Sequence, residues 1–301
     1  MTRKSITLVL LLLWSPAVFG GTLILKRAWI EKFKDRATID ASFTVDHAHK
    51  KPNAAKDDGD MHVAGRAPQE VGLPMVAEVV NAAGPGQQQA IKLIHGNEGS
   101  GKFVAISGAW RLWFEHPAVL QTQFANVPKA GNTNPDHSFQ IHPVSKFAGE
   151  DISSSFTFVP GFDGYDAKKA FGAYEKLSIS IRSTATAVTL DSKRVFYNYV
   201  HFKLRLVGNP FQLKDGGFAV FADIEDEEAE GDDAIAEKVR MIFVPATPPW
   251  KKIQNASEGN EFQALGIPRV NLNAIAAFVQ AAKNAAVTRK LPYEIIVVGM
   301  K

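Results

Sequence analysis

Apolar and polar residues alternate along several short stretches in the first half of the chain. The stretch Thr38–Val45 has an apolar residue at every second position, which is typical of a strand with one buried face. Gly108 lies inside a long apolar stretch, where a glycine often marks a bulge or the corner of a barrel. Further strands are expected at 60–64, 75–80, 102–114 and 138–144, with a short helix at 87–95.

These short strands around one helix predict a small closed β-barrel of the oligonucleotide/oligosaccharide-binding type. An immunoglobulin-like sandwich is the alternative, because it is also built from short alternating strands. A doubly wound nucleotide-binding domain is not expected. Residues 38–160 lack long helical periodicity, and no strand is followed by a Gly-x-Gly-x-x-Gly or Walker A sequence.

The second half predicts mixed elements, either α+β or mainly β. Gly108–Leu112 and Gly266–Val270 share the pattern Gly-x-x-Arg-aliphatic, which either reflects chance or marks a duplicated barrel. We therefore expect a β-barrel-like domain at 21–150 and an α+β domain at 151–301, which a duplication would make a second barrel. Helices are expected at 166–177 and 272–286, and strands at 156–159, 178–183, 185–190, 195–207, 218–224, 239–244 and 293–298.

Residues 1–20 have the pattern of a secretory signal peptide. Arg3 and Lys4 precede an apolar run at 6–14, and Val18 and Gly20 are small enough for a cleavage site. An uncleaved anchor is the weaker alternative, because a membrane span needs ~20 apolar residues. The pattern predicts an exported protein, periplasmic or secreted, with no stable membrane insertion after cleavage. The sequence contains no cysteine, which excludes disulfides and thiolate metal sites.

Charge is distributed unevenly along the second half. Eight acidic residues and no basic residue lie between Asp223 and Asp233, whereas the rest of that half is basic. A basic surface of this kind can bind an anionic polymer or an acidic glycan. The alternative is a solvated acidic loop beside an ordinary surface.

Histidine and carboxylate residues concentrate where two predicted strands begin. Asp60 and His62 belong to the segment Asp57–Val63, and His137 and His142 belong to Asn134–Pro143. Histidine and carboxylate side chains bind metals or move protons near neutral pH. The clustering therefore predicts one polar site built across neighbouring strands.

Strand periodicity predicts which side chains share a face. Met61 with Val63 and Phe139 with Ile141 should face the core, which puts His62 and His142 on the solvent or ligand face. We expect these two histidines within ~8 Å of each other on one sheet. Glu78, which interrupts an apolar run, should lie on the same sheet. His62, His137, His142, Asp60 and Glu78 are thus candidate ligands for a divalent metal, against metal-free acid–base catalysis or a purely structural role.

An aromatic and a cationic residue on the long strand suggest a binding platform. Trp110 and Phe114 share one face and are expected in the core, whereas Trp113 shares the other face with Arg111. A partly exposed Trp beside an Arg can stack on a base or a sugar ring. Ordinary packing is the alternative for both residues.

The segments Asp58–Val63, Pro74–Glu78, Asn134–His137 and Ile141–Val144 resemble those of a group of uncharacterised exported bacterial proteins. The resemblance covers less than a third of the chain. It implies a bacterial exported protein with a compact β domain, and it implies no reaction or substrate.

Two functions from different classes follow. The first is an exported binding protein for an anionic or sugar-rich polymer, contacted by His62, His142, Arg111 and Trp113. The second is a metal-dependent hydrolase, of the phosphodiesterase or nuclease type, that uses the His/carboxylate site. No complete catalytic motif decides between them.

Overall fold

The structure, a computed structural model, describes residues 20–123, 126–225, 234–282 and 285–301. The expected signal peptide, apart from Gly20, lies outside the described residues, and so does most of the acidic run at 223–233. No helix within the described ranges is long and apolar enough to cross a membrane.

The first barrel is a closed sheet of five strands in the order β4-β3-β2-β5-β7. Neighbouring strands are antiparallel except β4 and β7, which pair in parallel and close the barrel. Helix α2 (Gln88–Asn97) connects β4 to β5, as expected for the oligonucleotide/oligosaccharide-binding topology. The strands are β2 (Thr38–Ala48), β3 (Met61–Arg66), β4 (Met75–Val79), β5 (Phe103–His116) and β7 (His137–Phe147), and β8 (Glu150–Asp151) extends the edge beyond β7.

The long strand β5 bends where the sequence analysis expects it. Its pairing with β7 shifts register on both sides of Gly108. A Cβ atom at Gly108 would lie 2.4 Å from the carbonyl oxygen of Pro143, so a side chain does not fit. The glycine therefore lets β7 approach β5 closely enough to close the barrel.

The second barrel repeats the connectivity of the first. Its strand order is β14-β15-β18-β16-β12, with closure between β14 and β12, and its one parallel pair is β15 with β18. Helix α4 (Pro248–Ile253) stands between β15 and β16, as α2 stands between β4 and β5. The strands are β12 (Val200–Leu206), β14 (Phe218–Glu225), β15 (Ala236–Phe243), β16 (Glu261–Val270) and β18 (Tyr293–Met300), with β9 (Tyr165–Asp166) and β13 (Phe211–Gln212) at the edges.

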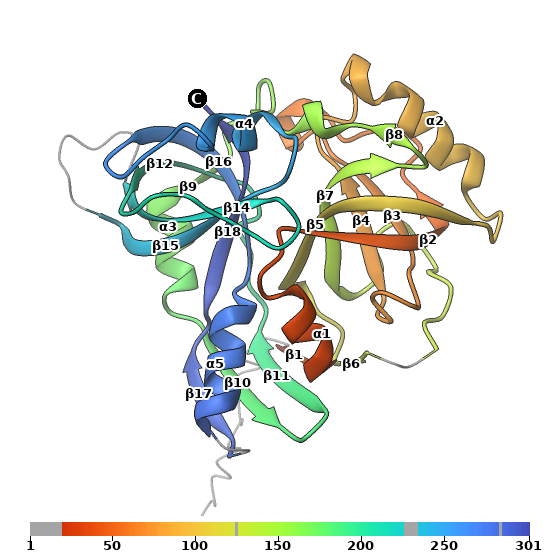
Figure 1. Cartoon of the computed structure of the whole chain (residues 1–301). Coiled ribbons are helices and arrows are strands. Elements are labelled where there is room, and N and C mark those ends of the chain that lie inside the picture. The colour runs from red at the N-terminus through yellow and green to blue at the C-terminus, as the bar shows by residue number, and fades with distance from the viewer. Residues whose placement is uncertain (1–19, 124–125, 226–233, 283–284) are drawn as a thin grey trace, which may run out of the picture.

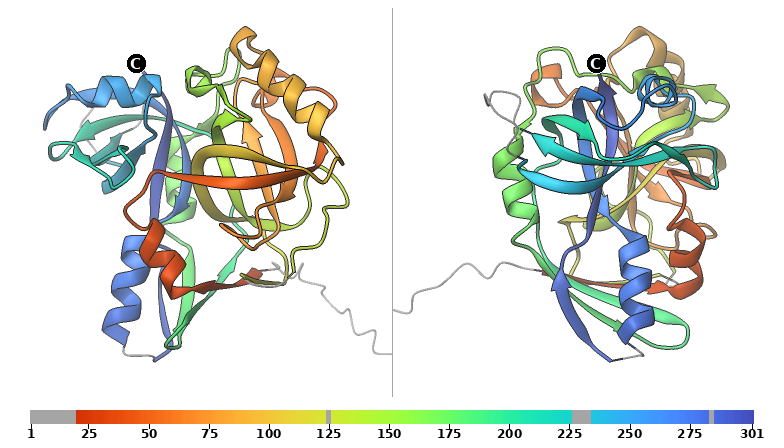
Figure 2. Two further views of the ribbon diagram at one scale, coloured as in Figure 1. Left: turned by 45° about the vertical axis from the view of Figure 1, so that its right-hand side comes forward. Right: turned by 60° about the vertical axis from the view of Figure 1, so that its left-hand side comes forward.

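A third sheet draws strands from both halves of the chain. Its order is β17-β10-β11-β1-β6, and β1 pairs antiparallel with β11 although 160 residues separate them in sequence. Figures 1 and 2 show the two barrels side by side, with this sheet and helices α1 and α5 below them. The strands of this sheet are β1 (Gly20–Lys26), β6 (Leu120–Thr122), β10 (Ser178–Ser183), β11 (Ala187–Lys193) and β17 (Val287–Lys290), and the helices are α1 (Arg27–Phe33) and α5 (Leu272–Ala282). Helix α3 (Ala167–Tyr174) contacts β9 and β12 of the second barrel.

The expected fold class is confirmed: the protein is mainly β with some α and contains small closed barrels. Residue 150 falls between the two barrels in the chain, but the third sheet takes strands from both sides of it. The sequence analysis expected a strand at 156–159, and this expectation is wrong. The apolar side chains of this stretch pack between the barrels instead. Strand β12 begins only at Val200, and residues 195–199 approach it as an irregular segment.

The barrels meet through β5 and β16, which carry the two Gly-x-x-Arg segments. The Arg111 Nε atom donates to the carbonyl oxygen of Pro268 at 2.9 Å. In return, the Arg269 Nη1 atom donates to the carbonyl oxygen of Trp110 at 3.0 Å. Each arginine thus bonds to the residue that precedes the other arginine, so the sequence likeness corresponds to a reciprocal contact.

Candidate functional site

Strand registers bring His62, Glu78 and His142 together on three neighbouring strands. His62 of β3 stands opposite Glu78 of β4. The parallel pairing of β4 and β7 aligns Ala77 with Ile141, which places Glu78 next to His142. The Glu78 Oε2 atom lies 3.4 Å from His62 Nε2 and 3.4 Å from His142 Nδ1. The two ring nitrogens are therefore separated by no more than twice 3.4 Å, which agrees with the ~8 Å expected from the sequence.

Asp60 and Tyr199 complete this group, which we call the polar cluster: Asp60, His62, Glu78, His142 and Tyr199. The Tyr199 hydroxyl donates to Asp60 Oδ2 at 2.6 Å and lies 2.9 Å from His142 Nε2. Asp60 Oδ2 is itself 3.1 Å from His142 Nε2. Tyr199 comes from the segment just before β12, so the second half of the chain supplies one member of the cluster. The sequence analysis did not connect Tyr199 with the histidine and carboxylate candidates of the first half.

The face that carries the cluster is covered rather than open to solvent. Asp60, Glu78 and His142 are buried, and only His62 retains partial exposure, with 17% of its side chain accessible. The expectation that His142 lies on a solvent-facing surface is therefore wrong. The periodicity correctly separated it from the barrel core, but the second half packs against that outer face.

Arg111 and Trp113 do not form an exposed platform. Arg111 has no accessible surface, and its guanidinium is held by Pro268, Glu115 and Gln140. Trp113 is 2% exposed and packs edge-on against Tyr174 of α3 at 5.4 Å between ring centroids. This corrects the sequence-based expectation, and the reason is again the second half, which covers this face of β5.

Gln140 links Arg111 to the polar cluster. The Arg111 Nη1 atom donates to Gln140 Oε1, and the Gln140 Nε2 atom donates to Glu78 Oε1. A donor fixed to Oε1 leaves Oε2 of Glu78 turned towards the two histidines. The chain Arg111–Gln140–Glu78 therefore orients this carboxylate, a role that Gln140 shows only in the folded structure.

His137 is not part of the cluster, although the sequence made it a candidate metal ligand. Its Nδ1 atom bonds to the carbonyl oxygen of Pro135 at 2.7 Å, and its ring stacks on His116 with centroids 5.5 Å apart. Burial lowers the pKa of His137 to about 4, so the ring is neutral at pH 7. His142 lies five positions further along β7.

The environment sets different protonation states in the cluster. Burial raises the pKa of Glu78, but the His142 and His62 imidazoles outweigh it and bring the pKa well below its usual range. Burial lowers the pKa of His62, but the Glu78 carboxylate outweighs it and raises the pKa to about 9. Burial lowers the pKa of His142 to about 4. At pH 7, Glu78 and His62 are therefore charged and His142 is neutral.

Burial, together with the neighbouring Glu78 carboxylate, raises the pKa of Asp60 well above its usual range. Burial also raises the pKa of Tyr199, which keeps the phenol protonated and able to donate to Asp60. A neighbouring cation would favour the charged form of Asp60. The group is thus sensitive to any positive charge placed beside it.

In one tautomer of His142, buried acceptor atoms in the cluster face each other without a donor between them. When the single hydrogen of neutral His142 is on Nε2, it points to Tyr199, and Nδ1 presents a lone pair to Glu78 Oε2. His142 Nδ1 and Asp60 Oδ1 have no hydrogen-bond partner. Opposed acceptors in a buried site need a positive charge between them, either a proton or a metal ion.

Asp60, Glu78 and His142 have the composition and spacing of a metal-binding group. Each offers one ligand atom, and the three atoms lie within 4.8 Å of one another. Zinc and similar ions hold such ligands at about 2.0–2.2 Å, so two ligands of a tetrahedral ion lie about 3.4 Å apart. The widest separation in the group would therefore shorten when an ion binds. His62 then stands beside the metal group rather than in it.

A cavity of about 180 Å³ opens beside the cluster. Its wall includes His62 and Glu78, so a small molecule in the cavity would reach both charged groups. The lining residues come from both halves of the chain: Asp57, Asp58, His62, Glu78, Glu115, His116, Gln140, Phe162, Tyr165, Asn198 and Tyr199.

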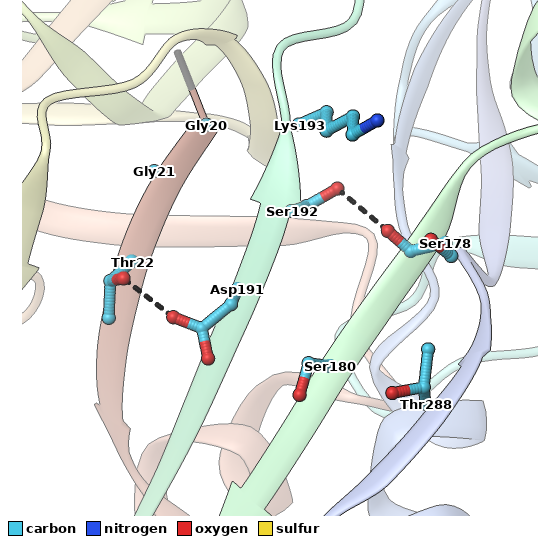
Figure 3. A pocket seen from close by; sticks show the side chains of 9 residues that line it. All are labelled: Gly20, Gly21, Thr22, Ser178, Ser180, Asp191, Ser192, Lys193 and Thr288. Atoms are coloured by element: carbon cyan, nitrogen blue, oxygen red, sulfur yellow. Dashed lines mark hydrogen bonds between the residues drawn. The ribbon is translucent and has the colours of Figure 1, made fainter. Parts of the chain in front are cut away.

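A larger cavity, about 330 Å³, lies on the third sheet (Figure 3). Its wall consists of glycine and hydroxyl residues with Asp191 and Lys193. Asp191 already accepts from Thr22 at 2.5 Å and pairs with Arg182 at 3.1 Å, and Ser192 donates to the Ser178 carbonyl oxygen. The charged groups that can perform chemistry are therefore concentrated at the smaller cavity.

Comparison with known proteins adds no functional assignment to this geometry. No protein-family model matches the chain, and no curated protein matches it.

Proposed function

We propose that the chain is an exported metal-dependent hydrolase whose divalent cation is bound by Asp60, Glu78 and His142. The observation that carries the proposal is the set of buried acceptor atoms in the polar cluster. His142 Nδ1 and Glu78 Oε2 stand 3.4 Å apart, and Asp60 Oδ1 has no partner. A divalent cation would satisfy all three acceptors and would compensate the buried Asp60 carboxylate.

The surrounding residues suit hydrolytic chemistry. A bound divalent ion would polarise a carbonyl or phosphoryl oxygen, or lower the pKa of a bound water molecule. His62 borders the cavity and lies 3.4 Å from Glu78. As an imidazolium it can donate a proton to a leaving group or stabilise a developing negative charge. Tyr199 and Gln140 hold His142 and Glu78 in place.

Export is part of this proposal. It is supported by the positive residues Arg3 and Lys4 followed by the apolar run at 6–14, and by the small residues Val18 and Gly20. The resemblance to exported bacterial proteins agrees with it but stays a prediction.

Binding of an anionic polymer or glycan also stays a prediction, and the geometry favours it less. Three of its four proposed contacts, His142, Arg111 and Trp113, are buried. The site at His62 and Glu78 is a small cavity rather than a groove that could follow a polymer backbone.

The metal content of protein purified without a nickel column tests the proposal. We expect stoichiometric zinc, manganese or iron in the wild-type protein, and its loss in the double variant Asp60→Asn His142→Ala. The variant His137→Gln is the matched control, because it alters a buried imidazole of the same strand outside the cluster. It should retain the metal.

Hydrolysis of small chromogenic esters, amides and phosphate esters tests the second step. The metal-loaded wild-type protein should hydrolyse at least one of these substrates, and His62→Gln should lower kcat by about 10²–10⁴-fold while the metal stays bound. A wild-type protein that takes up no divalent metal after exposure to Zn²⁺, Mn²⁺ and Fe²⁺ would refute the proposed function.

A further inference from the structure

The cavity beside the polar cluster has an acidic wall. Asp57, Asp58, Glu78 and Glu115 contribute four carboxylates, and no lysine or arginine is among the lining residues. Among these carboxylates, Glu78 faces the His62 imidazole at 3.4 Å. Glu115 is partly compensated by Arg111 at 3.1 Å. The entrance of the cavity therefore repels anions and attracts cations.

Aromatic rings form another part of the wall. Phe162 and Tyr165 line the cavity together with Tyr199. The Phe162 ring stands edge-on to Tyr199, with centroids 5.7 Å apart, and Tyr165 is 47% exposed. A ring face beside carboxylates is the arrangement that binds ammonium groups, because both supply negative potential.

An unpartnered acceptor in the wall supports the same ligand chemistry. The Asn198 Oδ1 atom is buried and has no hydrogen-bond partner, and Asn198 lines the cavity beside Tyr199. A ligand that brings N–H donors would satisfy this oxygen, whereas a carboxylate or a phosphate would add another acceptor.

We infer that the cavity binds a small substrate that carries an ammonium group, held by Asp57, Tyr165 and Asn198. This inference rests on the proposed function, because it takes the cavity beside the metal group as the substrate site. The volume of about 180 Å³ equals that of roughly six water molecules at ~30 Å³ each, which limits the bound part to a few heavy atoms. It also disfavours the phosphodiester and nucleic-acid substrates that the sequence suggested.

Three probes of equal length test this inference on the full chain: n-butylammonium, n-butanol and butyrate. Titrations followed by NMR chemical shifts should show that n-butylammonium binds at least tenfold more tightly than the other two. Tyr165→Ala and Asp57→Asn should each weaken n-butylammonium about 2- to 5-fold, as expected for exposed cation–π and charge contacts. Asp163→Asn, an exposed acid outside the lining residues, is the control and should leave the affinity unchanged.

The same titration in the His142→Ala variant, with EDTA present, separates this inference from the proposed function. Ammonium selectivity that persists without any bound metal supports the substrate class even if the metal proposal fails. A metal-containing wild-type protein that binds butyrate as tightly as n-butylammonium would overturn the substrate class and leave the metal site standing.

Discussion

The two barrels share one connectivity but differ in what fills equivalent positions. In the first barrel, His62 stands opposite Glu78, and in the second, Ala219 stands opposite Ile242. His142 follows Ile141 on β7, and Ile296 follows Ile295 at the corresponding place on β18. The polar cluster of the first barrel thus has an apolar counterpart made of Ala219, Ile242 and Ile296.

Other contacts confirm that these positions correspond. Asp58 Oδ1 accepts from the backbone N–H of Asp60 at 3.0 Å, and Asp215 Oδ1 accepts from that of Gly217 at 3.3 Å. In both turns the intervening residue is a glycine with positive φ. The loop chemistry is therefore retained, while the reactive Asp60 is replaced by Gly217.

The buried arginines follow the same correspondence with one difference. Arg111 contacts the neutral Gln140 on β7, whereas Arg269 pairs with the carboxylate of Glu294 on β18 at 2.6 Å. In the first barrel the glutamine transmits the contact to Glu78. In the second barrel Arg269 pairs directly with Glu294, whose other oxygen accepts from Arg240 at 2.8 Å.

This difference teaches what the fold requires. The second barrel closes with apolar residues at these positions, so the barrel does not need buried imidazoles and carboxylates there. Burying charged groups costs free energy unless they are fully paired. Groups that cost stability and leave acceptors unsatisfied are expected at functional sites.

The largest effect is expected when a charge enters the apolar site. Ile242→Glu places a carboxylate among Ala37, Leu213 and Ala219, with none of the partners that Glu78 has. We expect a loss of about 3–5 kcal/mol in the free energy of unfolding, measured by urea denaturation. The control is Phe221→Glu on the exposed side of β14, which should change it by less than ~0.5 kcal/mol. A loss in Ile242→Glu as small as that in Phe221→Glu would mean that the second site tolerates charge.

The next effect depends on pH and belongs to the first barrel. The folded-state pKa of His62 is about 9, above the unfolded value of 6.5, so the folded state binds the proton more tightly. This contribution is fully present below pH 6.5 and is lost as pH rises towards 9, up to about 3 kcal/mol in total. Urea denaturation of the wild type and of His62→Gln from pH 6 to 10 should show the loss only in the wild type. Parallel curves would contradict the His62–Glu78 ion pair.

Converting the first site into the second is expected to give a moderate gain in the free energy of unfolding. The triple variant His62→Ala, Glu78→Ile and His142→Ile copies the residues of the second barrel. We expect it to fold, to lose its metal, and to be more stable than the metal-free wild type by about 2 kcal/mol, because apolar residues replace buried ions. Calorimetry and metal analysis measure both results. A variant that does not fold would show that the first barrel depends on its polar cluster.

The smallest effect concerns the hydrogen bonds of the Tyr199 hydroxyl, which connect the two halves of the chain. Tyr199→Phe removes the hydroxyl that contacts Asp60 and His142 but keeps the ring. We expect a loss of about 1 kcal/mol in the free energy of unfolding and weaker metal retention, seen as faster loss of metal to a chelator. Tyr197→Phe, in the same segment, is the control and should retain its metal like the wild type. Unchanged retention in Tyr199→Phe would limit Tyr199 to packing.

The strands of the first barrel could be predicted to within three residues at each end, because most of them alternate polar and apolar residues, although β4 and β7 are buried on both faces. The stretch 38–45 became β2 and 138–144 became β7 with small extensions. The sequence analysis did not predict strand β16 and noted only the Gly-x-x-Arg pattern within it. The residues of β16 after Gln263 are buried, and polar and apolar residues do not alternate there. The helix expected at 166–177 became α3, and its N-cap Asp166 accepts from the Lys169 N–H through its side chain.

The sequence alone determined that His62 and His142 share a face and that Glu78 lies on the same sheet, because strand periodicity and apolar neighbours specify the register. Only the tertiary structure decided what covers that face. A local pattern separates the barrel core from its outside, but it does not tell whether the outside meets water or another part of the chain. Packing of the second half buried Arg111 and Trp113, brought Tyr199 to Asp60, and turned a surface of polar residues into an enclosed site.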